Sequence, residues 1–246
     1  MKPDHMPKLG PKYWTALVLA SVFGANTGDY LSDVMGLGHI AGLPVLAVLL
    51  GIIFLVERFD RFKHHAYFWS AIIVIRSAAT NIGDIGRDLH IHALLFMAFL
   101  AALLLVSLFV WQAFYGKQRQ TEPGNNSLAT GPVYWWTMLV AGALGTVIGD
   151  YFSWGLKLGN LNAALVLGAA LAVLFLLGRK GGLSNLFYYW LTVVCIRSAG
   201  TAAGDFFAHA VFGLPVSTLV SGLVFVALLV LWRERNGVRG PVCESA

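Results

Sequence analysis

Four aspartates, each preceded by a glycine, lie fifteen residues after a tryptophan in four separate apolar segments. A recurrence this strict indicates one structural unit present in four copies. An ionised carboxylate is expensive in hydrocarbon, so four at matching positions require a physical role. The Trp and Asp pairs are Trp14 and Asp29, Trp69 and Asp84, Trp135 and Asp150, and Trp190 and Asp205, and the motif glycines are Gly28, Gly83, Gly149 and Gly204.

The chain is also a tandem duplication. Its halves align without a gap at an offset of 121, which maps Asp29 to Asp150 and Arg76 to Arg197. Within the first half, an offset of 55 maps Asp29 to Asp84, so each quarter is predicted to be one helix hairpin. The predicted parts are a first half (1–116), a polar cytoplasmic linker (117–131), a second half (132–235) and a polar tail (236–246).

The composition indicates an integral membrane protein. The chain is 58% hydrophobic and 12% charged, with a mean hydropathy of +0.72, whereas soluble domains average about 25% charged residues. Helices of about 20 apolar residues span a bilayer. Eight segments approach that length: 13–35, 42–57, 67–87, 93–115, 133–155, 162–178, 187–210 and 214–232.

We therefore expect an all-α integral membrane fold of eight transmembrane helices, arranged as four parallel helix-hairpin repeats. Every quarter has two spans, so all four enter the membrane in the same direction, related by an axis along the membrane normal. The helices that carry Gly-Asp are expected to line the centre.

The basic residues predict the orientation. Outside the apolar segments' interiors, thirteen Lys and Arg fall on the side that holds both termini, and two, Arg87 and Lys157, fall on the other. This positive-inside pattern places the termini in the cytoplasm. We expect a multi-pass protein of the cell inner (plasma) membrane, with the lipid bilayer as partner. Because the net charge of +5 follows this distribution, nucleic acid is not an expected partner.

The segments NTGDYLSDVMGLG (26–38) and VIGDYFSWGLKLG (147–159) resemble the bacterial multi-pass "membrane-anchored protein" family. That family is built from a repeat of unknown function with a Gly-Asp signature, and the resemblance covers all four quarters. It implies a multi-pass membrane protein and singles out the Gly-Asp positions, but it implies no activity.

Helix geometry predicts where the charges lie. Each tryptophan is expected to anchor the start of its helix at the interface, which puts the Asp about 22 Å further along, in the outer third of the membrane. Arg76 and Arg197 each precede their Asp by eight residues, about 12 Å deeper, and should pair with acids or carbonyls of neighbouring helices. Two Arg against four Asp leave a deficit that a divalent cation, two monovalent cations or two protons would balance.

A second group of polar residues follows the four motif aspartates, which are expected to form a ring at one depth. Asp33 and Asp88 lie four residues after their Asp, on the same helix face, and His209 holds the equivalent place in the last quarter. We take Asp33, Asp88 and His209 as candidate metal ligands, since carboxylate and imidazole suit divalent metals. Ser32 and Ser153 are candidates to add hydroxyl oxygens to an ion site. The other histidines, including His39, are expected to be ordinary interfacial residues.

Two functions fit these residues. The first is transport of a cation, a divalent metal among the candidates, or of a small solute, through the Asp ring tuned by the two Arg, with one half moving against the other. The second is a non-transporting membrane scaffold or sensor, in which the Asp-Arg network is structural. The Asp side chains would then cap the helices that follow or accept backbone N–H groups where each hairpin turns. No catalytic motif is present, so we do not expect an enzyme, and no cofactor beyond a possible divalent cation.

Overall fold

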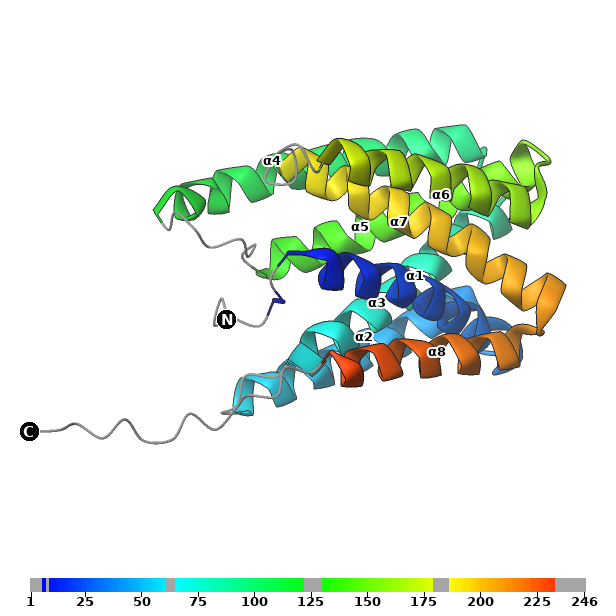
Figure 1. The fold of residues 1–246 in the computed structure, drawn as a ribbon, viewed down its shortest axis with the longest axis horizontal. Helices are drawn as coiled ribbons and strands as arrows, with labels where there is room; N and C mark the ends of the chain where they lie inside the picture. The colour runs from blue at the N-terminus through cyan, green and yellow to red at the C-terminus, as the bar shows by residue number, and fades with distance from the viewer. Residues whose placement is uncertain (1–5, 8, 61–64, 122–129, 179–185, 233–246) are drawn as a thin grey trace, which may run out of the picture.

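The computed structural model describes residues 6, 7, 9–60, 65–121, 130–178 and 186–232. All regular structure within these ranges is helical, as predicted (Figure 1). The predicted tail lies outside the described residues, as does most of the linker, whose first residues, 117–121, continue a helix. The α-helices are α1 (Pro11–Asp29), α2 (His39–Phe59), α3 (His65–Asp88), α4 (Ala93–Thr121), α5 (Pro132–Asp150), α6 (Gly159–Gly178), α7 (Leu186–Phe206) and α8 (Leu214–Leu231).

Three of the four Gly-Asp helices continue into a single wider turn of π-helix, η1 (Tyr30–Val34), η2 (Tyr151–Gly155) and η4 (Phe207–Val211). Such turns are rare and concentrate at functional sites. The chain then reverses at a glycine with positive φ, at Gly38, Gly159 or Gly213, a conformation that L side chains rarely adopt. The second quarter differs, because α3 runs on to Asp88 without a π-turn and reverses at His90.

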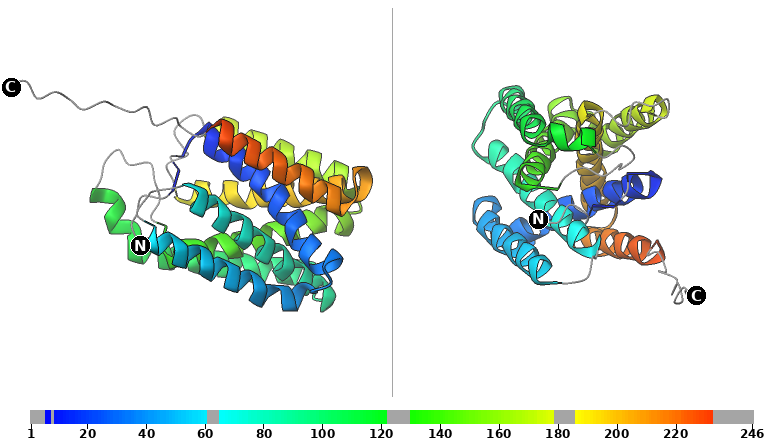
Figure 2. Two further views of the ribbon diagram at one scale, coloured as in Figure 1. Left: turned by 90° about the horizontal axis from the view of Figure 1, so that it is seen from below. Right: turned by 90° about the vertical axis from the view of Figure 1, so that its left-hand side faces the viewer.

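The four odd-numbered helices form a closed inner ring. Each of α1, α3, α5 and α7 packs against two of the others, in the cyclic order α1, α3, α5, α7. The even-numbered helices lie outside this ring, as the end-on view of Figure 2 shows. One continuous core of buried apolar residues extends through both halves of the chain.

The motif glycines bring neighbouring inner helices into close contact. A Cβ atom added at any of them would lie less than 3 Å from an atom of the next helix in the ring, so a side chain there would separate the helices. The distances from the added Cβ are 2.8 Å at Gly28 to the Ser77 carbonyl oxygen, 2.7 Å at Gly83 to Thr146 Cγ2, 2.9 Å at Gly149 to the Ser198 carbonyl oxygen and 2.7 Å at Gly204 to Asn26 Oδ1.

The outer helices expose apolar side chains on a scale that water does not favour. Phe109 of α4 is 75% exposed and Leu231 of α8 is 79% exposed, and they are two of many. Large exposed apolar surfaces of this kind mark contact with a membrane or a partner. Five described segments are long and apolar enough to cross a membrane: His39–Phe59, Ala93–Phe114, Pro132–Gly155, Gly159–Gly178 and Leu214–Leu231.

The three remaining helices of the eight predicted spans, α1, α3 and α7, are too polar to be recognised by composition alone. Their position explains this difference. They lie in the inner ring, where residues such as Asn26, Arg76 and Arg197 are buried against other helices, so the sequence there need not be apolar.

The two helices of each predicted hairpin scarcely touch. Instead, each even-numbered helix packs on the odd-numbered helix that follows it, α2 on α3, α4 on α5 and α6 on α7, while α8 packs on α1. The turn after each Asp therefore carries the chain sideways to the next inner helix. Helix α4 of the first half packs on α5 of the second, and α8 of the second half packs on α1 of the first, so the two halves are interleaved. This packing opposes the predicted movement of one half against the other.

The expectation that the four motif tryptophans anchor the helices at the lipid interface was wrong. All four are buried, Trp190 with only 1% exposure. With the residue before each of them they form an aromatic layer across the start of the inner ring, because the helices converge there and the rings fill the space between them. The layer consists of Tyr13, Trp14, Phe68, Trp69, Tyr134, Trp135, Tyr189 and Trp190.

Candidate functional site

The four motif aspartates gather at the end of the inner ring opposite the aromatic layer. Helices α1 and α5 end at Asp29 and Asp150, and α7 ends one residue after Asp205. Asp29 is close enough to the other three carboxylates for mutual electrostatic repulsion. Asp84 is 4% exposed and the others are partly buried. The structure thus brings together the four carboxylates that the sequence placed at one depth.

The aspartates do not cap the helices that follow Asp29 and Asp205. The N-cap positions of α2 and α8 are Gly38 and Gly213, and neither helix has a side-chain cap. For these two quarters, the structural explanation by helix capping is therefore contradicted.

Arg76 lies inside the ring, one layer deeper than the carboxylates. It is fully buried, and its Nη atoms donate to the hydroxyls of Thr80 (2.9 Å), Thr146 (2.8 Å) and Thr201 (2.6 Å), from three different inner helices. Its Nε donates to the Ser21 carbonyl oxygen at 3.3 Å. The expected pairing with carbonyls is therefore present, and no direct Asp partner is found among the described residues. Arg76 still interacts electrostatically with all four motif aspartates.

Arg197 occupies the equivalent position on α7 but points the other way. Its Nη2 lies 3.5 Å from the Met138 sulfur, four residues before Gly142 on α5, and it is within electrostatic range of the tyrosines of the aromatic layer. Within the described chain it has no acid partner, so the expected pairing with an acid or a carbonyl is absent there. Two guanidiniums on facing helices at one level repel each other and cannot both lie on the central axis of the inner ring. This repulsion accounts for the opposite directions of the Arg76 and Arg197 side chains.

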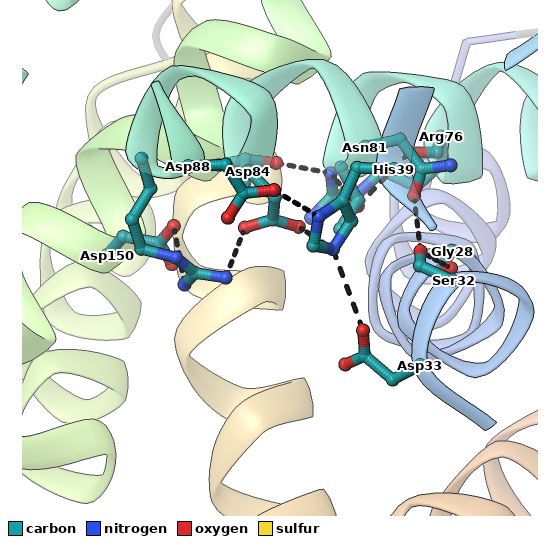
Figure 3. A network of polar contacts seen from close by, with 12 residues as sticks. Gly28, Ser32, Asp33, His39, Arg76, Asn81, Asp84, Asp88 and Asp150 are labelled. Carbon is teal, nitrogen blue, oxygen red and sulfur yellow. Dashed lines mark hydrogen bonds and ion pairs between the residues drawn. The ribbon is translucent and has the colours of Figure 1, made fainter. Parts of the chain in front are cut away.

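The outer mouth holds a network centred on His39, the first residue of α2. Its Nδ1 lies 2.7 Å from Asp88 Oδ2, and its Nε2 lies 3.8 Å from Asp84 Oδ2 and 3.7 Å from Asp33 Oδ1. Figure 3 shows the imidazole between Asp84 and Asp88 on one side and Asp33 on the other. His39 thus reaches one carboxylate of the motif ring and two of the second layer.

Arg87 connects two members of the ring. Its Nη2 lies 3.1 Å from Asp84 Oδ1 and its Nη1 lies 3.9 Å from Asp150 Oδ2. It also lines a cleft of about 260 Å³ together with Asp150, Phe96 and Trp154, between the ends of α3 and α5 and the start of α4. Asp29 and Asp205 have no ion pair in the described part of the chain.

The second-layer candidates meet different outcomes. Asp33 and Asp88 meet at His39, whereas His209 contacts the carbonyl oxygen of its own Asp205 at 3.0 Å, so the three candidate metal ligands are not brought together. The described residues contain no group of three or more His, Cys, Asp or Glu placed to hold a metal ion. Neither the three second-layer candidates nor the four carboxylates of the motif ring are therefore arranged as a metal site in this structure.

The two serines are buried beside the ring. The Ser32 hydroxyl donates to the Gly28 carbonyl oxygen at 2.7 Å and lies 3.1 Å from Asn81 Oδ1 (Figure 3). The Ser153 hydroxyl is buried and has no hydrogen-bond partner within the described parts of the chain. Ser32 therefore ties η1 to α3, and Ser153 is the one of the pair whose oxygen is available to a ligand.

Several residues of the site were missed or undervalued from the sequence. His39 was assigned to an ordinary interfacial role, and Arg87 was used only to orient the chain. Threonines within the helices were expected to bond their own backbone, and Thr80, Thr146 and Thr201 do so, but their second role as acceptors of Arg76 was missed. The threonine signal was present, because Thr80, Thr146 and Thr201 occupy one repeat position, four residues after the position of Arg76. His39 had no such signal, since it contacts the ring only through the packing of α2 on α3.

The sequence matches a known family over most of its length. The family described as Repeat of Unknown Function (DUF347) matches residues 12–61, 133–179 and 188–236. The quarter without a match contains α3 and α4, and this is also the quarter without a π-turn and with Arg87 after the motif. Neither a curated protein nor a solved structure matches the chain. With three repeats matched over more than half of its residues, the chain belongs to the family of the Repeat of Unknown Function (DUF347).

Proposed function

We propose that this polytopic helical protein spans the plasma membrane eight times, with cytoplasmic termini, and transports a cation that it binds at the ring of Asp29, Asp84, Asp150 and Asp205. The observation that carries the proposal is the incomplete neutralisation of this ring. Arg87 pairs with two of the four carboxylates, while Asp29 and Asp205 have no ion pair among the described residues. A buried cluster of carboxylates with fewer positive than negative charges favours a bound cation or protons.

The chemistry of the ring favours hard cations. Its donors are carboxylate oxygens, to which the free Ser153 hydroxyl adds another oxygen, and hard divalent ions such as Mn²⁺ and Mg²⁺ prefer such ligands. Below the ring, the Arg76 guanidinium and the aromatic layer occupy the axis. A cation cannot pass the fixed positive charge of Arg76 and the packed aromatic layer without rearrangement of the helices. This favours a carrier with an occluded site over an open channel.

The binding part of this proposal is tested by thermal unfolding of the detergent-purified protein. A cation that binds only the folded state raises Tm by mass action, by an amount that corresponds to about 2.7 kcal/mol at one hundred times its Kd. We expect Mn²⁺ or Mg²⁺ to raise Tm for the wild type but not for a variant with all four motif Asp changed to Asn. Asp88→Asn, outside the ring, is the matched control and should keep the shift.

Absence of a shift with any divalent or monovalent cation would contradict cation binding. If a shift is found, uptake of the same cation into proteoliposomes tests transport itself. Binding without uptake would leave a sensor as the better description.

The second candidate function is the membrane scaffold or sensor. The observation that favours it is the filled axis, with Arg76 held by three threonines and the tyrosine hydroxyls bonded to one another. In that case the Asp→Asn variants should lose stability in every buffer, with no dependence on cations.

A further inference from the structure

Arg197 is a buried charge without a counter-charge. Its side chain lies inside the inner ring with 1% exposure, and its Nε and Nη1 have no hydrogen-bond partner among the described residues. The remaining nitrogen, Nη2, lies 3.5 Å from the Met138 sulfur, which is a weak acceptor. An arginine remains protonated in proteins, and an unpaired buried cation costs several kcal/mol. The folded protein therefore needs something to compensate this charge.

The aspartates do not supply this compensation. The charged groups with the strongest influence on Arg76 are the four motif aspartates, whereas for Arg197 the charged group with the strongest influence is Arg76 itself, of the same sign. Because the two arginine side chains point in opposite directions, Arg76 lies toward the four carboxylates. Arg197 lies toward the aromatic layer, with Arg76 between it and the carboxylates.

The other groups within electrostatic range of Arg197 are three tyrosine hydroxyls. The hydroxyls of Tyr13 and Tyr189 are 2.6 Å apart, and those of Tyr134 and Tyr189 are 3.0 Å apart. Three hydroxyls carry three protons, and these two hydrogen bonds use two of them, so one proton remains to be donated. The tyrosine oxygens can also accept, but within the described chain none of them accepts from the Nε or Nη1 of Arg197. The guanidinium N–H groups and a spare hydroxyl proton thus lie in one region without a negatively charged acceptor from the described residues.

We propose that a small monovalent anion of the halide class binds inside the inner ring, between the Arg197 guanidinium and the hydroxyls of Tyr13, Tyr134 and Tyr189. An anion accepts hydrogen bonds from every side and carries the negative charge that compensates Arg197, which a water molecule does not. A single-atom anion needs less room than a polyatomic one, which suits a layer closed by Met138 and the aromatic side chains. The site is separate from the Asp ring, because Arg76 lies between them.

Bromide is the probe for this site, and gluconate, too large to enter, is the reference anion. At constant ionic strength and without divalent cations, replacing gluconate by bromide should raise Tm of the wild type by several degrees. Arg197→Met should unfold at the wild-type temperature or above it in gluconate, because the unpaired charge is gone, and should show no bromide shift. Tyr189→Phe, which removes the hydroxyl shared by both tyrosine bonds, should show a reduced shift.

A crystal grown in bromide gives the second measurement, with an anomalous peak expected within hydrogen-bonding distance of Arg197. No bromide shift in the wild type, or an equal shift in Arg197→Met, would overturn the proposal and leave buried water as the partner of Arg197. The variant with all four motif Asp changed to Asn should keep the bromide shift, so this test and the cation test fail independently.

Discussion

Replacing Arg76 with methionine should lower the free energy of unfolding by about 3–5 kcal/mol, the range for removing one partner from a buried charged network. The substitution removes the donor that the hydroxyls of Thr80, Thr146 and Thr201 share. It also removes the positive charge that faces four mutually repelling carboxylates. Equilibrium unfolding in mixed micelles at neutral pH measures the loss.

Arg197→Met is the matched comparison for this prediction, since the two arginines occupy equivalent positions in the duplicated halves. In halide-free buffer we expect Arg197→Met to leave stability unchanged or to raise it, because replacing an uncompensated buried charge by an apolar side chain is neutral or favourable. Equal destabilisation by the two substitutions would show that the arginines have the same environment and would refute the asymmetry between them.

The second large effect is expected at the motif glycines. Gly28→Ala and Gly149→Ala each place a Cβ less than 3 Å from a backbone carbonyl oxygen of the next inner helix, on Ser77 or Ser198. Backbone cannot move aside as a side-chain end can, so each substitution should cost about 1–3 kcal/mol of overpacking. The sites lie at different helix contacts, so the double variant should lose about the sum. Thermal unfolding of the three variants measures these losses.

Gly51 in α2 and Gly168 in α6 provide the controls, because a Cβ at either would meet nothing within 4 Å. Alanine there should be neutral or stabilising by about 0.5–1 kcal/mol, since glycine weakens a helix interior. If Gly149→Ala behaves like Gly168→Ala, the motif glycine does not serve packing, and a direct role beside Asp150 becomes the better explanation.

The sequence determined the class and the symmetry of this protein. A fixed Trp-to-Asp spacing on helices with a constant rise per residue places Asp29, Asp84, Asp150 and Asp205 at one level, whatever the details of packing. The offsets of 55 and 121 predicted four related units, of which three match the repeat family, and the apolar content predicted a membrane protein. These conclusions depend only on helix geometry and on the cost of exposing apolar side chains to water.

Only the tertiary structure decided which residues meet. Contacts across helices depend on how glycine contacts and turns direct the chain, and nothing local to His39 predicts that α2 packs on α3 and so brings it to Asp84 and Asp88. The same packing buries Trp190 and its equivalents, which composition alone assigned to the lipid interface. The opposite environments of Arg76 and Arg197 were also beyond the sequence, since equivalent positions in a repeat look alike until two like charges must share one axis.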